Sequence, residues 1–148
     1  MILNLPPSLA KSIELIKISR IEDTRGSLSF IESSSCIPFE IKRVYYLYDV
    51  PSGSSRGGHA HHNLEQLIIA GSGSFTIVLD SGLDRIEVQL DRPYNGLLIR
   101  SMIWRELKNF SSGSLCLVLA SQHYDEKDYI RDYDLFLSHT LMPSLDKP

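Results

Sequence analysis

The stretch SFTIVLDSGLDRIEVQLD, residues 74–91, decides the fold class of this chain. Its first part, 74–80, is rich in β-branched and aromatic residues, and its last part, 85–91, alternates apolar with polar side chains. The alternating apolar residues are Ile86, Val88 and Leu90. A period of two is typical of a β-strand with one buried face, and the polar turn SGLD joins the two parts. The stretch therefore predicts a β-hairpin.

Short segments on both sides of this hairpin are also typical of β-strands. Each is rich in apolar or aromatic residues and is bounded by turn residues such as Gly, Pro, Asp or Ser. These segments are 12–18, 26–32, 41–50, 64–71, 95–107 and 114–121. Many short strands in succession indicate an antiparallel barrel or sandwich of about eight or more strands.

The C-terminal end has a different pattern. Within 124–141, apolar and aromatic residues recur at helical spacing. Asp125 is a suitable N-cap, and acidic residues in the first turn suit the helix dipole. We expect a helix here that covers one end of the barrel. The predicted fold is therefore an all-β barrel with a C-terminal helix.

Length and composition are those of one globular domain spanning 1–148. Apolar residues make up 43% of the chain and charged residues 22%. No apolar run approaches the ~18 residues of a membrane span, and the N-terminal residues do not have the pattern of a secretory signal. The two cysteines, Cys36 and Cys116, are far apart and are expected to be reduced. These features predict a cytoplasmic protein without membrane segments.

The charge pattern limits the class of partner. The net charge is −3, and the basic residues are scattered along the chain. Nucleic-acid binding usually requires a basic patch or stripe, so nucleic acid is not expected as a partner. A small anionic ligand held by two or three arginines is compatible with this pattern.

The stretch RGGHAHHNLEQ, residues 56–66, contains three of the five histidines. On a strand, His59 and His61 lie on one face and His62 on the other. Two glycines precede them and permit unusual backbone geometry or the close approach of a ligand. If the shared face is the barrel interior, two imidazoles meet in a cavity. Neutral imidazoles suit either a metal site or acid–base catalysis.

This stretch resembles the first motif of the cupin superfamily. Five residues separate Gly53 from His59-Ala60-His61, Glu65 follows three residues later, and glycines stand at 71 and 73. Many cupins bind a metal through two such histidines, the glutamate and a further histidine in a second motif. The matching stretch here, RPYNGLLIRSMIW, has the turn residues Pro93 and Gly96 but no histidine.

A closer resemblance covers about 110 residues in six blocks that follow the same order. The blocks are DTRGSLSFIE, IPFEIKRVYYLYDVP, RGGHAHHNLEQ, NGLLIRSMIWREL, FSSGSLCLVLAS and YDEKDYIRDYDLF. They are similar to dTDP-4-keto-6-deoxyglucose 3,4-ketoisomerases, small cupins of bacterial deoxyamino-sugar pathways. The resemblance implies a jelly-roll barrel and a metal-independent isomerase without a cofactor, acting on a dTDP-linked keto sugar. It also implies a homodimer whose subunits exchange N-terminal strands.

The implied reaction moves a ketone from carbon 4 to carbon 3. A proton leaves carbon 3 and one returns at carbon 4 through an enediol(ate), which requires a base, an acid and a donor for the developing oxyanion. Histidine suits the first two roles because its unperturbed pKa is about 6.5. His59 and His61, about 7 Å apart along a strand, are expected to form the proton-transfer pair. Which of them abstracts the proton is left open.

Further site residues are assigned by the resemblance. It places Tyr45 in the cavity as a hydroxyl donor and Arg43, which shares its strand parity, close to the ligand. Arg56 and Arg25 are expected to bind the diphosphate, since arginine matches phosphate oxygens in a bidentate fashion. With exchanged strands, Arg25 would serve the site of the partner subunit.

Two residues have a weaker assignment. Glu65 is expected to hydrogen-bond a histidine and so set its tautomer, or else to be a polar strand residue. Trp104 is expected to pack against the base or the sugar, or else to belong to the core. The tyrosines, in turn, could be core or rim aromatics, and single arginines could be solvated surface charges.

Rival functions follow from the same residues. One is a metal-dependent cupin enzyme, such as a dioxygenase, that uses His59, His61 and Glu65. Another is a non-catalytic cupin that binds a sugar nucleotide. A nucleotide-sugar 3,5-epimerase is less similar, because its motif has one histidine where HAH stands here. The product configuration at carbon 4 and the identity of the nucleotide stay open.

Overall fold

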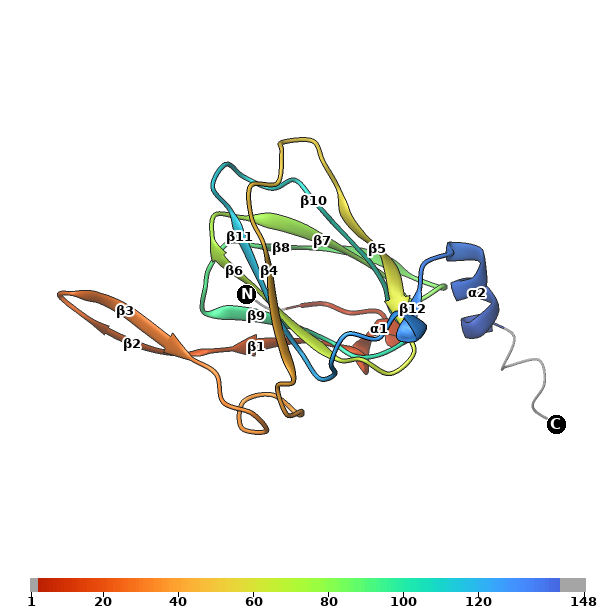
Figure 1. Ribbon diagram of the computed structural model, residues 1–148, viewed down its shortest axis with the longest axis horizontal. Helices are drawn as coiled ribbons and strands as arrows, with labels where there is room; N and C mark the ends of the chain where they lie inside the picture. The colour runs from red at the N-terminus through yellow and green to blue at the C-terminus, as the bar shows by residue number, and fades with distance from the viewer. Residues whose placement is uncertain (1–2, 142–148) are drawn as a thin grey trace.

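The computed structural model describes residues 3–141, and these fold into two antiparallel sheets that face each other, as Figure 1 shows. The first sheet has the order β1-β9-β6-β11-β4, with bounds Ile13–Lys17, Asn95–Ile99, Gln66–Ser72, Leu115–Ala120 and Arg43–Leu47. The second has the order β12-β5-β10-β7-β8, with bounds Tyr129–Ile130, Arg56–His61, Trp104–Lys108, Phe75–Asp80 and Arg85–Leu90. The predicted all-β barrel is confirmed.

The hairpin predicted from residues 74–91 is formed by β7 and β8. The two strands pair antiparallel, with Phe75 opposite Leu90 and Asp80 opposite Arg85. On β8, Val88 and Leu90 are buried and Glu87 and Gln89 are exposed, as the alternation of side chains required.

The main core fills the space between the two sheets. It consists of inward-facing side chains from both, among them Ile68, Phe75, Ile77, Leu79, Leu97, Ile99 and Val118. A second apolar cluster lies on the other face of the first sheet, where Ile37 and Phe39 cover Leu67, Leu98 and Leu119. Strands buried on both faces read as continuous apolar runs, which is why β6, β9 and β11 show little alternation.

A separate hairpin extends away from the barrel. Strands β2 (Ser19–Asp23) and β3 (Gly26–Phe30) pair only with each other, and every residue in them is exposed. Figure 1 shows this arm projecting from the barrel, on the side opposite to the C-terminal helix α2 (Tyr133–Leu141). Arg20 of the arm stacks on the Tyr94 ring at 4.3 Å, but the apolar side chains Ile21, Leu28 and Phe30 are exposed and available for another surface.

The helix predicted over 124–141 is wrong in its first half. Asp125 caps a short 3-10 helix, η1 (Glu126–Asp128), by accepting a hydrogen bond from the backbone of Lys127. Strand β12 follows, and it pairs with β5, Tyr129 opposite His61. Pairing with the free edge of a sheet therefore overrides the helical spacing, and only α2 is an α-helix in this segment.

The remaining elements close the ends of the barrel. A short helix that the sequence did not predict, α1 (Pro7–Ala10), precedes β1. Helix α2 packs Phe136 against Trp104, Ala60 and Ile130, and so covers the end of the second sheet. None of the helices within residues 3–141 has the length and apolar character needed to span a membrane.

Candidate active site

The two glycines of RGGHAH form a β-bulge that shapes the site. Along the pairing of β5 with β10, Arg105 is opposite His59 and Glu106 is opposite Gly57, so Gly58 is an extra residue. Gly57 and Gly58 have φ values of 87° and 73°, which favour glycine. A side chain at Gly57 would also meet the Arg105 carbonyl oxygen at 3.1 Å.

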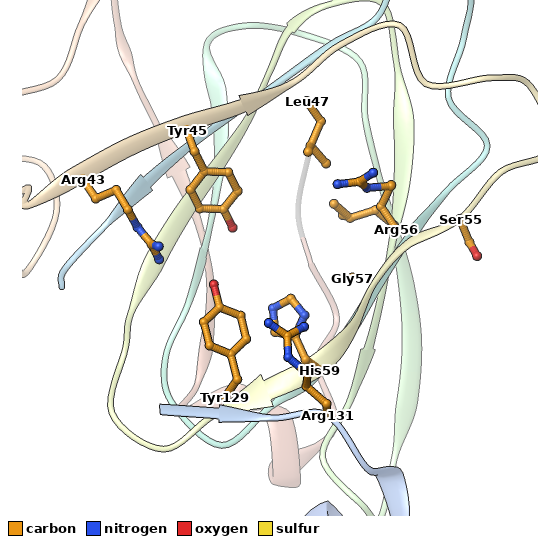
Figure 2. Close-up of a pocket in the computed structure, with 10 residues that line it drawn as sticks. Arg43, Tyr45, Leu47, Ser55, Arg56, Gly57, His59, Tyr129 and Arg131 are labelled. Atoms are coloured by element: carbon orange, nitrogen blue, oxygen red, sulfur yellow. The ribbon is translucent and has the colours of Figure 1, made fainter. Parts of the chain in front are cut away.

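The bulge changes which side chains share a face. Residues 56 and 59 are three apart, and in a regular strand they would point to opposite faces. The extra residue restores the parity, and both Arg56 and His59 line the same cavity. Figure 2 shows both side chains directed into it.

This cavity has a volume of about 480 Å³ and lies between β4, β5 and the segment that contains β12. One side of it carries Arg43 and Tyr45, and the opposite side carries Tyr129 and Arg131 (Figure 2). The complete lining is Arg43, Tyr45, Leu47, Ser55, Arg56, Gly57, His59, Leu107, Tyr129 and Arg131. The described lining thus holds three arginines and no carboxylate, which makes the cavity suited to an anion.

His59 and His61 lie side by side, but only one of them reaches the cavity. Their rings are 4.8 Å apart in an edge-to-face arrangement, which confirms that they share a face. His59 lines the cavity, whereas His61 is 1% exposed and lies behind it. His62 points the other way, and its ring contacts that of His139.

His61 is held by a buried carboxylate that sequence analysis missed. Nδ1 of His61 is 3.0 Å from Oδ2 of Asp128. The Asp128 carboxylate as a whole also accepts hydrogen bonds from the backbone N–H groups of Asn63 and Leu64. A carboxylate can only accept, so Nδ1 of His61 carries the proton and the tautomer is set. Asp128 was hidden in the stretch predicted as helix, 67 residues away in sequence.

Both imidazoles are neutral at neutral pH. Burial, reinforced by the guanidinium of Arg105, lowers the pKa of His59 to about 4. Burial, followed by Arg105 and His59, also lowers the pKa of His61. Neither ring nitrogen of His59 has a hydrogen-bond partner within the described residues. The cavity is therefore lined by a neutral imidazole, in which one ring nitrogen carries a proton and the other can accept one.

Two tyrosines face each other across the cavity. The hydroxyl groups of Tyr45 and Tyr129 point toward one another in Figure 2. Burial raises the pKa of Tyr45 to about 12, so its hydroxyl keeps its proton at neutral pH and can donate a hydrogen bond. The ring of Tyr129 is 5.0 Å from that of His59. Tyr129 was read as part of a helix, and pairing of β12 with β5 is what brings it here.

The arginines of the cavity differ in how they are held. Arg43 lies 5.2 Å from the centre of the Tyr45 ring, and Arg131 lies 4.3 Å from that of Tyr129. Arg131 also donates two hydrogen bonds to Glu126, at 2.6 and 2.9 Å. This pair raises the pKa of Arg131 further above its usual range and keeps the guanidinium at the rim.

Besides His61, three predicted site residues lie outside this cavity. Arg25 is on the exposed arm, where its guanidinium bonds Asp23. The expectation that Glu65 bonds a histidine is wrong, because its carboxylate faces Arg100 at 3.7 Å and Asp128 takes that role. Trp104 is 6% exposed and contacts Tyr133 and Phe136, so it belongs to the core under α2 rather than to the cavity.

The metal set of the rival function is not assembled either. The Glu65 carboxylate faces Arg100, and nowhere in residues 3–141 do three or more His, Cys, Asp or Glu side chains gather in a metal-binding arrangement.

Three relatives found by comparison with known proteins are named as sugar 3,4-ketoisomerases or 3,4-oxoisomerases. A TDP-4-oxo-6-deoxy-alpha-D-glucose-3,4-oxoisomerase of Aneurinibacillus thermoaerophilus is 44% identical over 134 residues, which are 90% of this chain and 96% of the relative. The crystal structure of a sugar 3,4-ketoisomerase from Thermoanaerobacterium thermosaccharolyticum in complex with TDP has a TM-score of 0.88 and 41% identity. It covers 89% of this chain and 96% of that one.

A second solved structure is a TDP-quinovose 3,4-ketoisomerase from Campylobacter jejuni. It is 49% identical, has a TM-score of 0.83, and covers 86% of this chain and 98% of its own. These structures confirm the predicted cupin-type barrel. The family model described as "FdtA: WxcM-like, C-terminal" matches residues 11–140. The family model and the alignment with the 44% identical relative each span most of this chain. The chain therefore belongs to the FdtA family.

Proposed function

We propose that the chain is a 3,4-ketoisomerase that converts a dTDP-4-keto-6-deoxyhexose into its 3-keto isomer. The observation that carries this proposal is a neutral histidine, His59, with both ring nitrogens unpartnered, at an arginine-lined cavity. The 44% identical relative is named for this activity. A role in bacterial deoxyamino-sugar biosynthesis and a cytoplasmic location are part of the same proposal.

In this mechanism His59 is the group that contacts the reacting carbons. The carbon 3–hydrogen bond breaks, its proton moves to the imidazole, and the electron pair forms the enediolate with oxygen 4. The protonated imidazole of His59 then gives its proton to carbon 4, and the proton of oxygen 3 moves to oxygen 4, so that oxygen 3 becomes the carbonyl and oxygen 4 the hydroxyl. Tyr45 and Tyr129, which face each other beside His59, donate hydrogen bonds to the sugar oxygens.

His61 has a different place from the one expected of a proton-transfer pair. It lies behind His59 with Nδ1 bound to Asp128. We infer that its edge-to-face contact orients the ring of His59. Direct proton transfer between His61 and the sugar would require His59 to move aside.

The diphosphate is assigned to the arginines of the cavity. Arg43, Arg56 and Arg131 reach it from three different segments of the chain; the described lining holds no carboxylate, and of the three only Arg131 forms an ion pair within residues 3–141, with Glu126. A nucleoside diphosphate carries about two negative charges, which arginines bind through bidentate hydrogen bonds.

Binding of dTDP alone is expected to weaken when Arg56 is replaced with alanine. The lost charge-assisted hydrogen bonds are worth about 1.5–3 kcal/mol, or about 10- to 100-fold in Kd. Titration calorimetry measures this change. Arg92→Ala, an exposed arginine outside the cavity, is the matched control. Equal Kd values for Arg56→Ala and the wild-type protein would contradict the phosphate assignment.

We also propose a homodimer in which the β2–β3 arm packs on the partner subunit and places Arg25 at the partner's cavity. In the isolated chain Ile21 is 59% exposed and Leu28 57%, although both are apolar. The edge strand β4 exposes Val44 and Tyr46 on its outer face as well. Apolar patches of this kind are typical of interfaces between copies of a chain.

Sedimentation at micromolar concentration is expected to give a dimer. Replacing Ile21 and Leu28 together with serine removes apolar area from the arm and should shift the protein toward monomer. Leu83→Ser, at an exposed leucine outside the arm, should leave the dimer intact. A monomeric wild-type protein would remove the reason for assigning Arg25 to a site.

The activity itself is tested by incubating the protein with dTDP-4-keto-6-deoxyglucose and following the sugar by NMR. We expect the 3-keto isomer to appear, with the same rate after exhaustive treatment with a chelator. An unchanged substrate would contradict the isomerase. Conversion that stops on metal removal and returns with a divalent metal would favour the metal-dependent cupin instead.

A further inference from the structure

Arg105 is a buried arginine beside the active site with no assigned role. It lies on β10 directly opposite His59, and it is 2% exposed. Its Nε and Nη2 donate to the carbonyl oxygen of Ile103, at 3.2 and 2.8 Å. Its Nη1 is buried without a partner within the described residues. None of the ion pairs formed by residues 3–141 includes it.

An unpaired buried cation is unfavourable for folding. Removing an ion from water carries a large penalty, and a neutral carbonyl compensates for only part of it. The carboxylate that acts on Arg105 is Asp128, which is already bound to His61 and two backbone N–H groups. An apolar side chain would fill the same space without the penalty, so the charge calls for an explanation.

The charge of Arg105 acts on the ring of His59. From β10 the positive guanidinium disfavours a second positive charge on the imidazole. Burial is the larger cause of the lowered pKa of His59, and Arg105 is the next; the remaining groups are weaker or cancel. Arg131 has the same sign as Arg105, but it is exposed and paired with Glu126, which acts in the opposite sense. The Gly57 backbone also favours the protonated ring.

The remaining neighbours of the ring do not carry a compensating negative charge. On β4, Tyr45 keeps its proton, and Arg43 is positive. On β5 itself, His61 is neutral. Tyr129, from β12, contacts the ring with its aromatic face. Arg105 is therefore the one fully buried charge opposite His59 among the described residues.

We propose that Arg105 is a positioning residue whose fixed charge keeps His59 unprotonated, so that His59 enters the reaction as a base. This inference deepens the proposed function and rests on it, since only there does His59 accept a proton from the substrate. Arginine suits the task because it stays protonated even when buried, whereas a buried lysine can lose its proton.

The test is the titration of His59 in the ligand-free protein. Histidine is labelled with ¹³C, and the Cε1–H signal of each ring is followed from pH 3.5 to 8, with His59→Asn identifying the signal. In the wild-type protein His59 should titrate near pH 4. In Arg105→Met its pKa should rise by about one unit or more toward 6.5, because burial remains while the facing charge is gone.

Two further variants keep the outcome decisive. Arg105→Lys is still protonated near pH 4, where His59 titrates, because buried lysines lose their proton only at about pH 5–6 or above, and it should leave the titration of His59 near that of the wild type. Arg100→Met removes one positive charge at a distance from the cavity and should also leave it unchanged. A rise with Arg105→Met alone supports the proposal. An unchanged His59 in Arg105→Met, or an equal rise in Arg100→Met, would overturn it.

The acid limb of the pH–rate profile is a second measurement of how Arg105→Met changes the protonation of His59. For kcat/KM it should move to higher pH in Arg105→Met, because more of the free enzyme then has His59 protonated at a given pH. The titration does not depend on catalysis. An absent isomerase activity with an intact shift in the titration would therefore refute the proposed function and not the action of Arg105 on His59.

Discussion

His59→Asn is expected to lower kcat by about 10²- to 10⁴-fold while dTDP still binds. Asparagine keeps the approximate size and polarity of the imidazole but cannot take up a proton at neutral pH, and general acid–base catalysis contributes on this scale. Binding should persist because the arginines that line the cavity are unchanged. Steady-state kinetics on dTDP-4-keto-6-deoxyglucose and calorimetry with dTDP measure the two effects separately.

The matched control is His123→Asn, which changes an exposed histidine outside this cavity. It should leave kcat and the Kd of dTDP as they are. Full activity in His59→Asn would transfer the proton steps to Tyr45 or to water. A simultaneous loss of dTDP binding would instead indicate that the substitution disturbs the cavity as a whole.

Asp128→Ala is expected to reduce the free energy of unfolding by roughly 3–5 kcal/mol, because three hydrogen-bond donors lose their acceptor at about 1–3 kcal/mol each. The Asp128 side chain is buried and accepts hydrogen bonds from Nδ1 of His61 and from the backbone of Asn63 and Leu64. Alanine leaves these donors without an acceptor in an apolar surrounding. Urea denaturation, with the slope m compared between variants, measures the change.

Asp125→Ala is the control for this prediction. Asp125 caps the same short helix, η1, but its side chain is exposed, and losing a cap of this kind costs about 1 kcal/mol. Asp128→Asn should fall between the two alanine variants, because an amide oxygen can still accept one or two of the bonds. Equal losses for Asp128→Ala and Asp125→Ala would show that the buried contacts of Asp128 contribute little.

The histidine stretch shows how much of the site can be predicted from the alternation of residues along one strand. Strand parity predicted that His59 and His61 share a face, and their rings do lie in contact. Arg56 was expected near the ligand, and it shares the cavity with His59 only because the bulge at Gly57 and Gly58 offsets their odd spacing. A pair of glycines permits a bulge, but its position depends on the pairing of β5 with β10, which is not a local property.

The C-terminal segment shows the opposite case. Its spacing of apolar residues suits a helix, yet Tyr129 and Ile130 pair with β5 because a free sheet edge offers their backbone hydrogen bonds. This pairing of residues 129 and 130 with β5, in place of a helix, places Tyr129 and Arg131 in the cavity and Asp128 beside His61. The resemblance covered this block, but residue periodicity alone assigned its tyrosine to the face of a helix.

The sequence by itself determined the all-β class, the hairpin of residues 75–90, the shared face of His59 and His61, and the family. These follow from side-chain periodicity and from motifs whose residues are close in the chain. Only the tertiary structure decided that His59 reaches the cavity, that Asp128 rather than Glu65 holds His61, and that Arg105 lies unpaired opposite His59. Each of these contacts joins strands that are dozens of residues apart, and burial and charge act through space rather than along the chain.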